Sequence, residues 1–549
     1  MSAFSPLRVA YFCMEYGLAA EFTIYSGGLG VLAGDYMKSI GDLRMPAIGL
    51  GLFWDQGYTK QLIDNAGNPE DAYPPTPRDS ISTLDVSLEV TVAGKPIACI
   101  AHRVERYTSA TLYLIEPERE ADRWITRRLY GGGEDDRLAQ EIVLGVGGVR
   151  LLQALGHTID VYHFNEGHAV FSGLELVRQR CEKGLSFSDA LADVKEHIVF
   201  TTHTPVPAGN EVHDWAAMRR MSADLGFSSD ELGELGGSPF SMTETGLRIS
   251  RRANAVAELH GETARGMWQH VSGGAPIIAI TNGVHAPTWQ DPRIRASVVQ
   301  DKDEEAQNAE LWLVHQKLKA ELCAEIARRT GVELRIDDLL IGFARRAAVY
   351  KRANLVLEDE NQMESVFFEH GVQLVYAGKA HPHDFSGKAL VRRLVEASRR
   401  WPENIVFLEN YDMALGALLT RGCDVWLNTP RRPKEASGTS GMKAAMNGVL
   451  NVSIADGWWP EGCRHGETGW QIGMPDPSDA EAGEAAIDRR DREVLYRVFA
   501  DEVIPRYQDH RSRWVAMMKE SIAMSQWRFS SDRMVQEYYA RLYRRDPSP

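Results

Sequence analysis

The stretch VYHFNEGH, residues 161–168, holds the pattern that decides the fold. It begins with a short, mostly apolar run and continues with a polar loop that contains a glycine and a histidine. A similar order recurs at residues 198–204, where the polar loop contains a histidine, and at residues 277–285, where it contains a glycine and a histidine. Short buried strands that alternate with loops and helices are typical of a parallel α/β sheet. Ligands of such sheets bind at the carboxyl ends of the strands, so we expect these three loops to face one cleft.

A second series of short apolar runs follows a charged, helix-prone stretch at residues 300–330. The runs lie at 339–344, 372–377, 405–408, 425–428 and 449–454. We therefore predict an α/β protein with two Rossmann-like domains and a cleft between them. The expected parts are an N-terminal domain (1–299) with a β-rich insert, a C-terminal domain (300–520), and a helical segment (521–549) that packs back on the N-terminal domain.

Composition narrows the class of protein. The 549 residues are 44% hydrophobic and 25% charged, as in ordinary globular proteins, and the formal net charge is -15. An acidic chain argues against a nucleic-acid or anionic-membrane partner. The six cysteines form no Cys-x-x-Cys pair, and no apolar run is long enough to span a bilayer. The N-terminus makes a poor signal peptide, so we expect a cytoplasmic protein.

The stretch EASGTSGMK, residues 435–443, is the most informative for chemistry. Its glycines let the backbone approach a ligand closely, and N–H groups at a helix start can hold an anion. Lys443 could carry an aldehyde cofactor as a Schiff base. The alternative is an ordinary strand–loop–helix turn.

Two further stretches are candidate anion sites. RRAAVYKR, residues 345–352, places four cations directly after a buried strand, where they could receive a phosphate. The alternative is a solvated basic helix face. Gly27 and Gly28 open a glycine-rich turn between a strand and a helix. No Gly-Lys-Ser/Thr follows them, so this is not a P-loop.

Polar side chains at the predicted strand ends suit a sugar. His203, Asn165, Glu166, His168 and Asn282 offer hydrogen-bond partners for hydroxyl groups. A lone histidine is more often structural, which is the alternative for His203.

No metal site is predicted. His163 and His168 lie five residues apart on a loop, a poor spacing for a pair of ligands. His381 and His383 fit a turn before a helix. The chain also lacks a Gly-x-Ser-x-Gly nucleophile motif.

Taken in order, these motifs resemble the α-glucan (glycogen/starch/maltodextrin) phosphorylase family, in particular its short bacterial form. The resemblance runs from about residue 9 to residue 543. It is carried by YSGGLG (25–30), LYGG (129–132), NEGH (165–168), THTP (202–205), TNG (281–283), residues 346–352, ENY (409–411), residues 435–443 and DGWW (456–459).

The resemblance implies a GT-B fold and pyridoxal 5′-phosphate as cofactor. Lys443 would hold the cofactor as a Schiff base, and its phosphate would act as the acid and base. Gly438, Thr439 and Ser440 would bind that phosphate, and Tyr411 would lie near the ring.

For the substrates, the resemblance assigns Arg346 and Lys351 to inorganic phosphate, helped by backbone N–H groups at Gly27 and Gly28. Glu435, His203 and Asn282 would bind the glucosyl unit, with Asn165, Glu166 and His168 beside them. The implied reaction is the reversible phosphorolysis of an α-1,4-glucan to glucose 1-phosphate with retention. The oligomeric state stays open, with a homo-oligomer as one alternative.

The chain departs from the long animal enzymes at three positions: Ser440 and Gly441 replace Gly and Asn, and Ala348 replaces His. These changes leave glucan preference and phosphate affinity open.

Two other functions compete. A nucleotide-sugar glucosyltransferase of the glycogen synthase type shares the glycine turn. Such enzymes resemble Lys-Thr-Gly-Gly-Leu-Gly there, whereas Tyr25 and Ser26 precede the glycines of this chain. They also place a glutamate where this chain has Lys443. A non-catalytic glucan-binding protein would not need Lys443, Arg346, Lys351 and His203.

Overall fold

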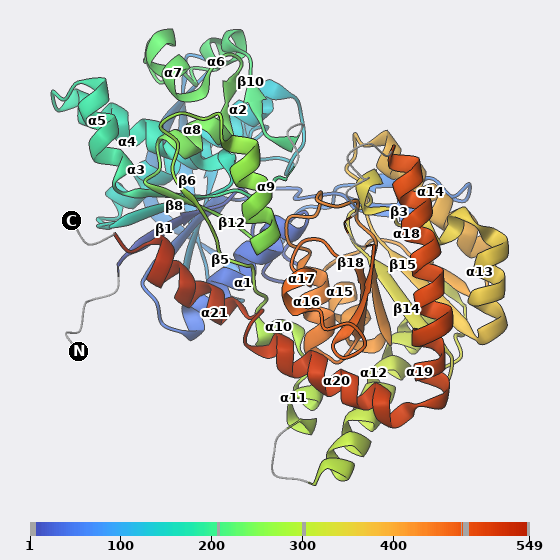
Figure 1. Ribbon diagram of the computed structural model, residues 1–549. Coiled ribbons are helices and arrows are strands. Elements are labelled where there is room, and N and C mark those ends of the chain that lie inside the picture. Colours follow the sequence, from blue (N-terminus) through green and yellow to red (C-terminus); the bar gives the residue numbers. More distant parts are fainter. Residues whose placement is uncertain (1–6, 206–208, 299–302, 474, 476–482, 546–549) are drawn as a thin grey trace. The chain divides into compact units, whose positions relative to one another are not determined.

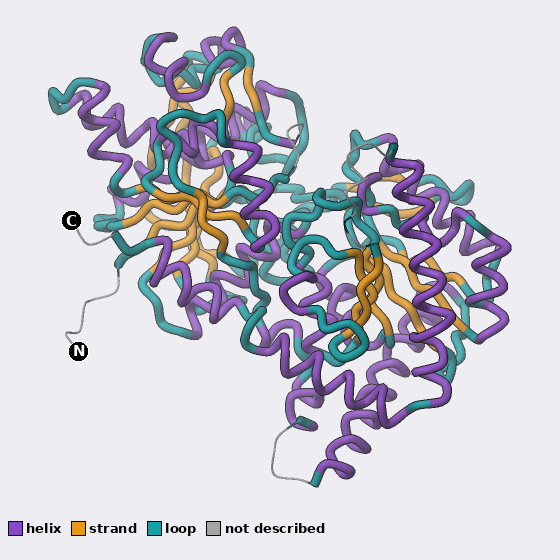
Figure 2. The backbone as a smooth tube through the Cα atoms, in the orientation of Figure 1, coloured by secondary structure: helices purple, strands orange, loops and turns teal. Residues whose placement is uncertain are grey.

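The computed structural model describes residues 7–205, 209–298, 303–473, 475 and 483–545. The chain forms two compact units, each with its own sheet. Unit 1 comprises the residues up to Tyr58, Tyr73–Asn282 and the residues from Ser531, and unit 2 comprises Thr59–Ala72 and Gly283–Ser530. Figure 1 shows the elements of both units, and Figure 2 shows that helices cover the strands of each sheet.

Unit 1 is built on a nine-stranded sheet in the order β13-β12-β9-β8-β1-β2-β7-β6-β5. Neighbouring strands from β13 to β7 are parallel, whereas β6 and β5 add an antiparallel edge. The strands are β1 (Val9–Phe12), β2 (Ala47–Leu52), β5 (Ile81–Val92), β6 (Lys95–Val104), β7 (Thr111–Pro117), β8 (Val161–Asn165), β9 (Ile198–Thr201), β12 (Arg252–Ala255) and β13 (Ile277–Ala279). A small pair, β10 (Val212–His213) and β11 (Phe240–Ser241), lies outside this sheet.

The principal helices of unit 1 are α1 (Gly28–Asp42), α2 (Glu134–Ile142), α3 (Gly148–Ala154), α4 (Val170–Glu182), α5 (Phe187–Lys195), α6 (Trp215–Arg220), α7 (Ser229–Gly236), α8 (Met242–Arg248), α9 (Glu258–Trp268) and α21 (Ser531–Glu537). Helix α21 comes from the far end of the chain and lies beside α1 (Figure 1). The hydroxyl oxygens of Ser39 and Ser531 are 2.6 Å apart, and those of Tyr36 and Tyr543 are 2.9 Å apart. The C-terminal segment therefore completes the core of unit 1.

Unit 2 contains a six-stranded parallel sheet in the order β16-β15-β14-β17-β18-β19. Its strands are β14 (Leu339–Ala344), β15 (Val372–Ala377), β16 (Ile405–Leu408), β17 (Val425–Asn428), β18 (Leu450–Ile454) and β19 (Gly469–Ile472). In chain order this is 3-2-1-4-5-6, the doubly wound Rossmann topology. The strand order reverses between β14 and β17, where such sheets bind ligands.

The principal helices of unit 2 are α10 (Ala286–Trp289), α11 (Pro292–Ser297), α12 (Glu304–Thr330), α13 (Glu360–Val366), α14 (Phe385–Arg400), α15 (Met413–Gly422), α16 (Thr439–Met446), α17 (Trp459–Gly462), α18 (Glu484–Val498), α19 (Ile504–Asp509) and α20 (Arg511–Gln526). The hairpin β3 (Lys60–Ile63) and β4 (Pro69–Ala72) also belongs to this unit. Helix α12 lies within the charged stretch 300–330. Its buried Lys319 and His315 contact the two oxygens of Asp424, at 2.6 and 2.8 Å, and so fix the helix to the sheet.

The predicted α/β class with large parallel sheets is confirmed. None of the described helices is both long and apolar enough to cross a membrane.

Candidate active-site groups in each unit

The loops that carry the predicted sugar-binding residues of unit 1 all leave the carboxyl ends of parallel strands. Strand β1 pairs with β2 on one side and with β8 on the other, so the strand order reverses there. The glycine turn follows β1, Glu166 and His168 follow β8, and His203 follows β9. The structure thus brings loops far apart in sequence to one edge of the sheet.

His203, Asn165 and Glu166 form one hydrogen-bonded group. His203 Nε2 donates to Asn165 Oδ1 at 2.6 Å, and the backbone N–H of His203 donates to Glu166 Oε2 at 2.8 Å. Burial, with a smaller contribution from His260, lowers the pKa of His203 to about 3. The imidazole is therefore neutral at pH 7, and it can hydrogen-bond a sugar hydroxyl without bringing a charge.

Glu166 occupies a strained backbone conformation with φ of 79°. Tyr130, Arg352 and Asn410, which also lie in the sequence motifs, have positive φ as well. Non-glycine residues rarely adopt this region, and such strain tends to occur at functional sites. Burial also raises the pKa of Glu166 to about 7.

The glycine turn is held in place by Glu15. Its buried carboxylate accepts hydrogen bonds from the backbone N–H groups of Ser26 (2.5 Å) and Gly27 (3.3 Å) and from the hydroxyl of Tyr130 (2.9 Å). A Cβ added at Gly30 would lie 2.5 Å from Glu15 Oε2, so this position must be glycine. A Cβ at Gly27 or Gly28 would instead meet no atom within 4 Å. The start of α1 therefore faces open space that an anion can enter.

Asn282 and His168 lie at two further loops of unit 1. Asn282 is 3% exposed, and no hydrogen-bond donor reaches its Oδ1 among the described residues. His168 lines a cavity of about 280 Å³ together with Arg137 and Glu211. Its Nε2 lies 3.7 Å from Glu211 Oε2.

In unit 2 the predicted residues gather where the strand order reverses. Arg346 and Lys351 follow β14, and Glu435 lies in the loop after β17. Lys351 Nζ is 2.6 Å from Glu435 Oε2, and Arg345 Nη1 is 3.4 Å from the same oxygen. Burial alone would raise the pKa of Glu435, but Arg345 and Lys351 outweigh it and hold that pKa at about 2. Three cations, with Arg346, thus surround one ionised carboxylate.

Asp456 supports the same loop from β18. Its two oxygens accept hydrogen bonds from the backbone N–H groups of Glu435 and Gly457, both at 2.9 Å. Burial, and then the nearby Glu435 charge, raise the pKa of Asp456 to about 7. Asp456 therefore fixes the backbone from which Glu435 projects.

Lys443 lies on α16, which begins directly after Gly438. Gly438 has φ of 84°, in the left-handed region that favours glycine. Lys443 Nζ lies 3.4 Å from the centroid of the Trp289 ring. The side chain is 8% exposed, so the amine is held in one place by cation–π contact.

Several buried polar atoms around the start of α16 have no hydrogen-bond partner among the described residues. They are Ser437 Oγ, Asn428 Oδ1 and Arg345 Nε. Buried polar groups are normally satisfied. Ser437 Oγ and Arg345 Nε can donate to an anionic group, whereas Asn428 Oδ1 only accepts and gives no support for an anion. Ser440 Oγ accepts a hydrogen bond from Trp426 Nε1 at 3.2 Å. A Cβ at Gly441 would lie 2.6 Å from Asn451 Oδ1, which explains why no larger residue stands there.

Tyr411 follows β16 and is partly buried. Burial raises the pKa of its hydroxyl to about 12, so the phenol stays protonated. The adjoining Glu409 accepts from the backbone N–H of Ile63 at 2.8 Å, which ties the β3–β4 hairpin to this loop.

Glu15, Asp456 and Trp289 had no role predicted from the sequence. Asp456 stands inside the motif at residues 456–459 and could have been found there, whereas Arg345 was among the four predicted cations of residues 345–352. Glu15 acts through hydrogen bonds and Trp289 through a cation–π contact, and only the folded chain shows both.

Comparison with known proteins identifies the family. The chain is similar to a maltodextrin phosphorylase of Thermococcus litoralis, with 40% identity over 97% of this chain and 70% of that protein. It is 36% identical to a glycogen phosphorylase of Mycobacterium bovis (98% and 71% covered) and 34% identical to a glycogen phosphorylase of Aquifex aeolicus (97% and 86% covered). Residues 278–460 match the family model for carbohydrate phosphorylase.

The chain belongs to the carbohydrate phosphorylase family. The resemblance predicted from the motifs is thereby confirmed. A phosphorylase is favoured over the nucleotide-sugar glucosyltransferase, because the relatives match nearly the whole chain and carry phosphorylase names.

Proposed function

We propose that this protein is an α-1,4-glucan phosphorylase that uses pyridoxal 5′-phosphate. It transfers the terminal glucosyl unit of a maltodextrin or glycogen chain to inorganic phosphate, and it releases glucose 1-phosphate with retention. The reaction brings two phosphate groups close together, so an excess of fixed cations and N–H dipoles is required.

The residues around α16 fit the cofactor. The start of the helix, with Thr439 and Ser440 and the backbone at Gly438, would hold its phosphate. Lys443 would bind the cofactor covalently through Nζ, and Tyr411 would lie near its ring. The unsatisfied Ser437 Oγ supports this assignment. When bound, the cofactor supplies through its phosphate the proton that the leaving glucan oxygen needs.

The remaining groups bind and orient the substrates. Arg346 and Lys351 of unit 2 bind inorganic phosphate as fixed cations. In unit 1 the backbone N–H of Gly28 is the proposed donor to a phosphate oxygen, and Gly27, whose N–H donates to Glu15, shapes the turn that presents it. Glu435 accepts hydrogen bonds from glucosyl hydroxyl groups, which its low pKa permits throughout the neutral range.

In unit 1 the neutral His203 and Asn282 donate to or accept from hydroxyl groups of the glucan. Asn165 and Glu166 hold His203 in position through the hydrogen bonds described above. His168 contributes a neutral imidazole at the neighbouring cavity, because burial lowers its pKa to about 4.

The observation that carries the proposal is the position of Lys443. Its Nζ lies 3.4 Å from the centroid of the Trp289 ring, and its helix begins two residues after Ser437, whose buried hydroxyl has no hydrogen-bond partner among the described residues. The test is to release bound pyridoxal phosphate with acid and to measure glucose 1-phosphate formed from maltodextrin and phosphate. We expect about one equivalent of cofactor per chain. Lys443→Arg keeps the charge over Trp289 but should lose both cofactor and activity.

Lys434→Ala is the matched control, because this lysine lies in the same loop and pairs with Glu484 at 2.9 Å. It should retain cofactor and activity. Cofactor-free wild-type protein that remains inactive after reconstitution would contradict the proposal.

A further inference from the structure

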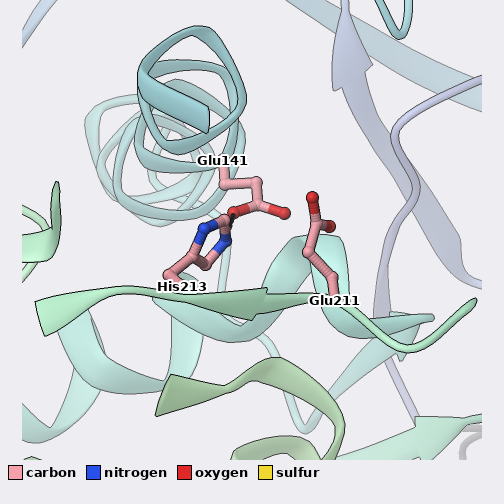
Figure 3. Close-up of side chains that lie close together, drawn as sticks. All are labelled: Glu141, Glu211 and His213. Carbon is pink, nitrogen blue, oxygen red and sulfur yellow. Dashed lines mark hydrogen bonds and ion pairs between the residues drawn. The ribbon is translucent and has the colours of Figure 1, made fainter. Parts of the chain in front are cut away.

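Three side chains of unit 1 that the proposed reaction does not use converge in one cluster. Glu141 lies on α2, Glu211 precedes β10, and His213 lies on β10 (Figure 3). One potential ligand atom from each lies within 4.8 Å of the other two. Glu141 and His213 are 0% and 2% exposed, so the cluster is largely shielded from water.

One oxygen of Glu141 has a partner and the other has none. Oε2 lies 3.0 Å from His213 Nε2. Oε1 is buried, and no hydrogen-bond donor reaches it among the described residues. Figure 3 shows a Glu141 oxygen directed toward the Glu211 carboxylate. Two carboxylates that face each other away from water repel unless a cation or a proton lies between them.

The nearby arginine pairs with Glu211 rather than with Glu141. Arg137 Nε lies 3.0 Å from Glu211 Oε1 and offsets this carboxylate. A further carboxylate, that of Glu134, lies 3.6 Å from His213 Nδ1. The formal count is three carboxyl groups against one guanidinium. Burial raises the pKa of Glu141 to about 8 and that of Glu211 to about 7, so these two groups hold a proton near neutral pH that a bound cation would displace.

A second buried pair in the same unit shows how the chain satisfies such a carboxylate. His102 Nε2 lies 2.7 Å from Glu116 Oε1, and both residues are almost wholly buried. Here Arg78 donates to both Glu116 oxygens, at 2.7 and 2.8 Å. The cation at Glu116 is therefore supplied by the chain, whereas Glu141 has no equivalent arginine bond among the described residues.

We propose that Glu141, Glu211 and His213 bind one divalent transition-metal ion. One imidazole nitrogen and two carboxylate oxygens suit Zn²⁺ or Mn²⁺, whereas Ca²⁺ and Mg²⁺ prefer oxygen ligands alone. Ligands of a tetrahedral zinc ion lie about 3.3 Å apart, so small side-chain rotations would close the site.

The ion would have a structural role. It would occupy the space before Glu141 Oε1 and link α2 to β10, two elements far apart in sequence. Glu211 also lines the cavity that His168 shares, so water has access to a position left open on the ion.

The test measures metal binding rather than catalysis, so it is independent of the proposed function. Wild-type protein is treated with a chelator, dialysed against ZnCl₂ or MnCl₂ near neutral pH, and passed through a desalting column. We expect about one ion per chain and a higher melting temperature with the ion than without it. Glu141→Gln should weaken binding by at least about tenfold.

His102→Gln is the matched control and should bind the ion as the wild type does. Wild-type protein that retains neither Zn²⁺ nor Mn²⁺ would overturn the proposal and assign a proton to the carboxylate pair. Stoichiometric binding that Glu141→Gln leaves unchanged would overturn it as well. If Glu141→Gln does not fold, His213→Asn replaces it, and the wild-type stoichiometry still decides.

Discussion

Lys351 Nζ lies 2.6 Å from Glu435 Oε2, and this ion pair joins the loops that follow β14 and β17. These strands flank the point at which the six-stranded sheet reverses its order, so the pair stands where a doubly wound sheet binds ligands. Arg345 shares the same oxygen at 3.4 Å. A single carboxylate therefore holds two cations in place before any substrate arrives.

The first prediction concerns this pair in catalysis. Glu435→Gln removes the negative charge that holds Lys351 and Arg345, and it weakens acceptance from sugar hydroxyl groups. We expect kcat/KM for phosphorolysis to fall by about 10²-fold, the loss typical of a charged positioning group. Steady-state kinetics with maltodextrin checks it. Glu484→Gln, which changes an exposed glutamate beside Lys434, should leave the rate constants near wild type.

The second prediction concerns stability in acid. The pKa of Glu435 is about 2 in the folded chain, below the ordinary value of 4.5. Its contribution to the free energy of unfolding is therefore fully present above about pH 4.5 and is lost as the pH falls toward 2. Urea unfolding across this range should show a steeper loss in the wild type than in Glu435→Gln. Parallel curves for the two proteins would contradict the assignment.

The third prediction concerns the support of the glycine turn. Glu15→Gln removes the charge and replaces one of the two acceptor oxygens with an NH₂ group. The side chain can then no longer accept both from Ser26 and Gly27 on one oxygen and from Tyr130 on the other. We expect a loss of about 1–3 kcal/mol in the free energy of unfolding, together with a higher KM for phosphate. Tyr130→Phe removes only the single bond to Glu15 and should cost less. An unchanged KM for phosphate in Glu15→Gln would show that this turn does not take part in phosphate binding.

The fourth prediction separates binding from stability. A Cβ at Gly28 meets no atom within 4 Å, so Gly28→Ala should fold normally, with a change below about 1 kcal/mol. The same methyl group would stand where phosphate approaches the start of α1. We expect the KM for phosphate to rise by about tenfold, or ~1.4 kcal/mol. Gly266→Ala, in α9 and equally open, should leave the KM for phosphate unchanged and stabilise the protein by no more than about 1 kcal/mol.

Much of the architecture follows from local pattern. Short apolar runs such as 339–344 and 425–428 form the parallel strands where the sequence predicts them, because a strand buried on both faces needs an unbroken run of apolar residues. The apolar run at residues 161–164 likewise forms most of strand β8 (Val161–Asn165). Most of the candidate site residues also stand in loops directly after such strands.

The cluster of Glu141, Glu211 and His213 had no sequence signal. Its members lie on a helix, a loop and a two-residue strand, and Glu141 is far in sequence from the other two. The predicted absence of a metal site considered only histidines close together in the chain. Metal ligands are defined by distance in space, which linear spacing reveals only within one element.

The sequence by itself determined the family, the parallel α/β class and the segments that carry Lys443, Glu435 and His203, since apolar periodicity and glycine placement are local properties. The tertiary structure alone decided which charges meet. Three contacts join segments that are distant in the chain: the ion pair of Lys351 with Glu435, the contact of Lys443 with Trp289, and the hydrogen bond of Tyr130 to Glu15. Electrostatic interactions depend on separation and burial, and folding fixes both.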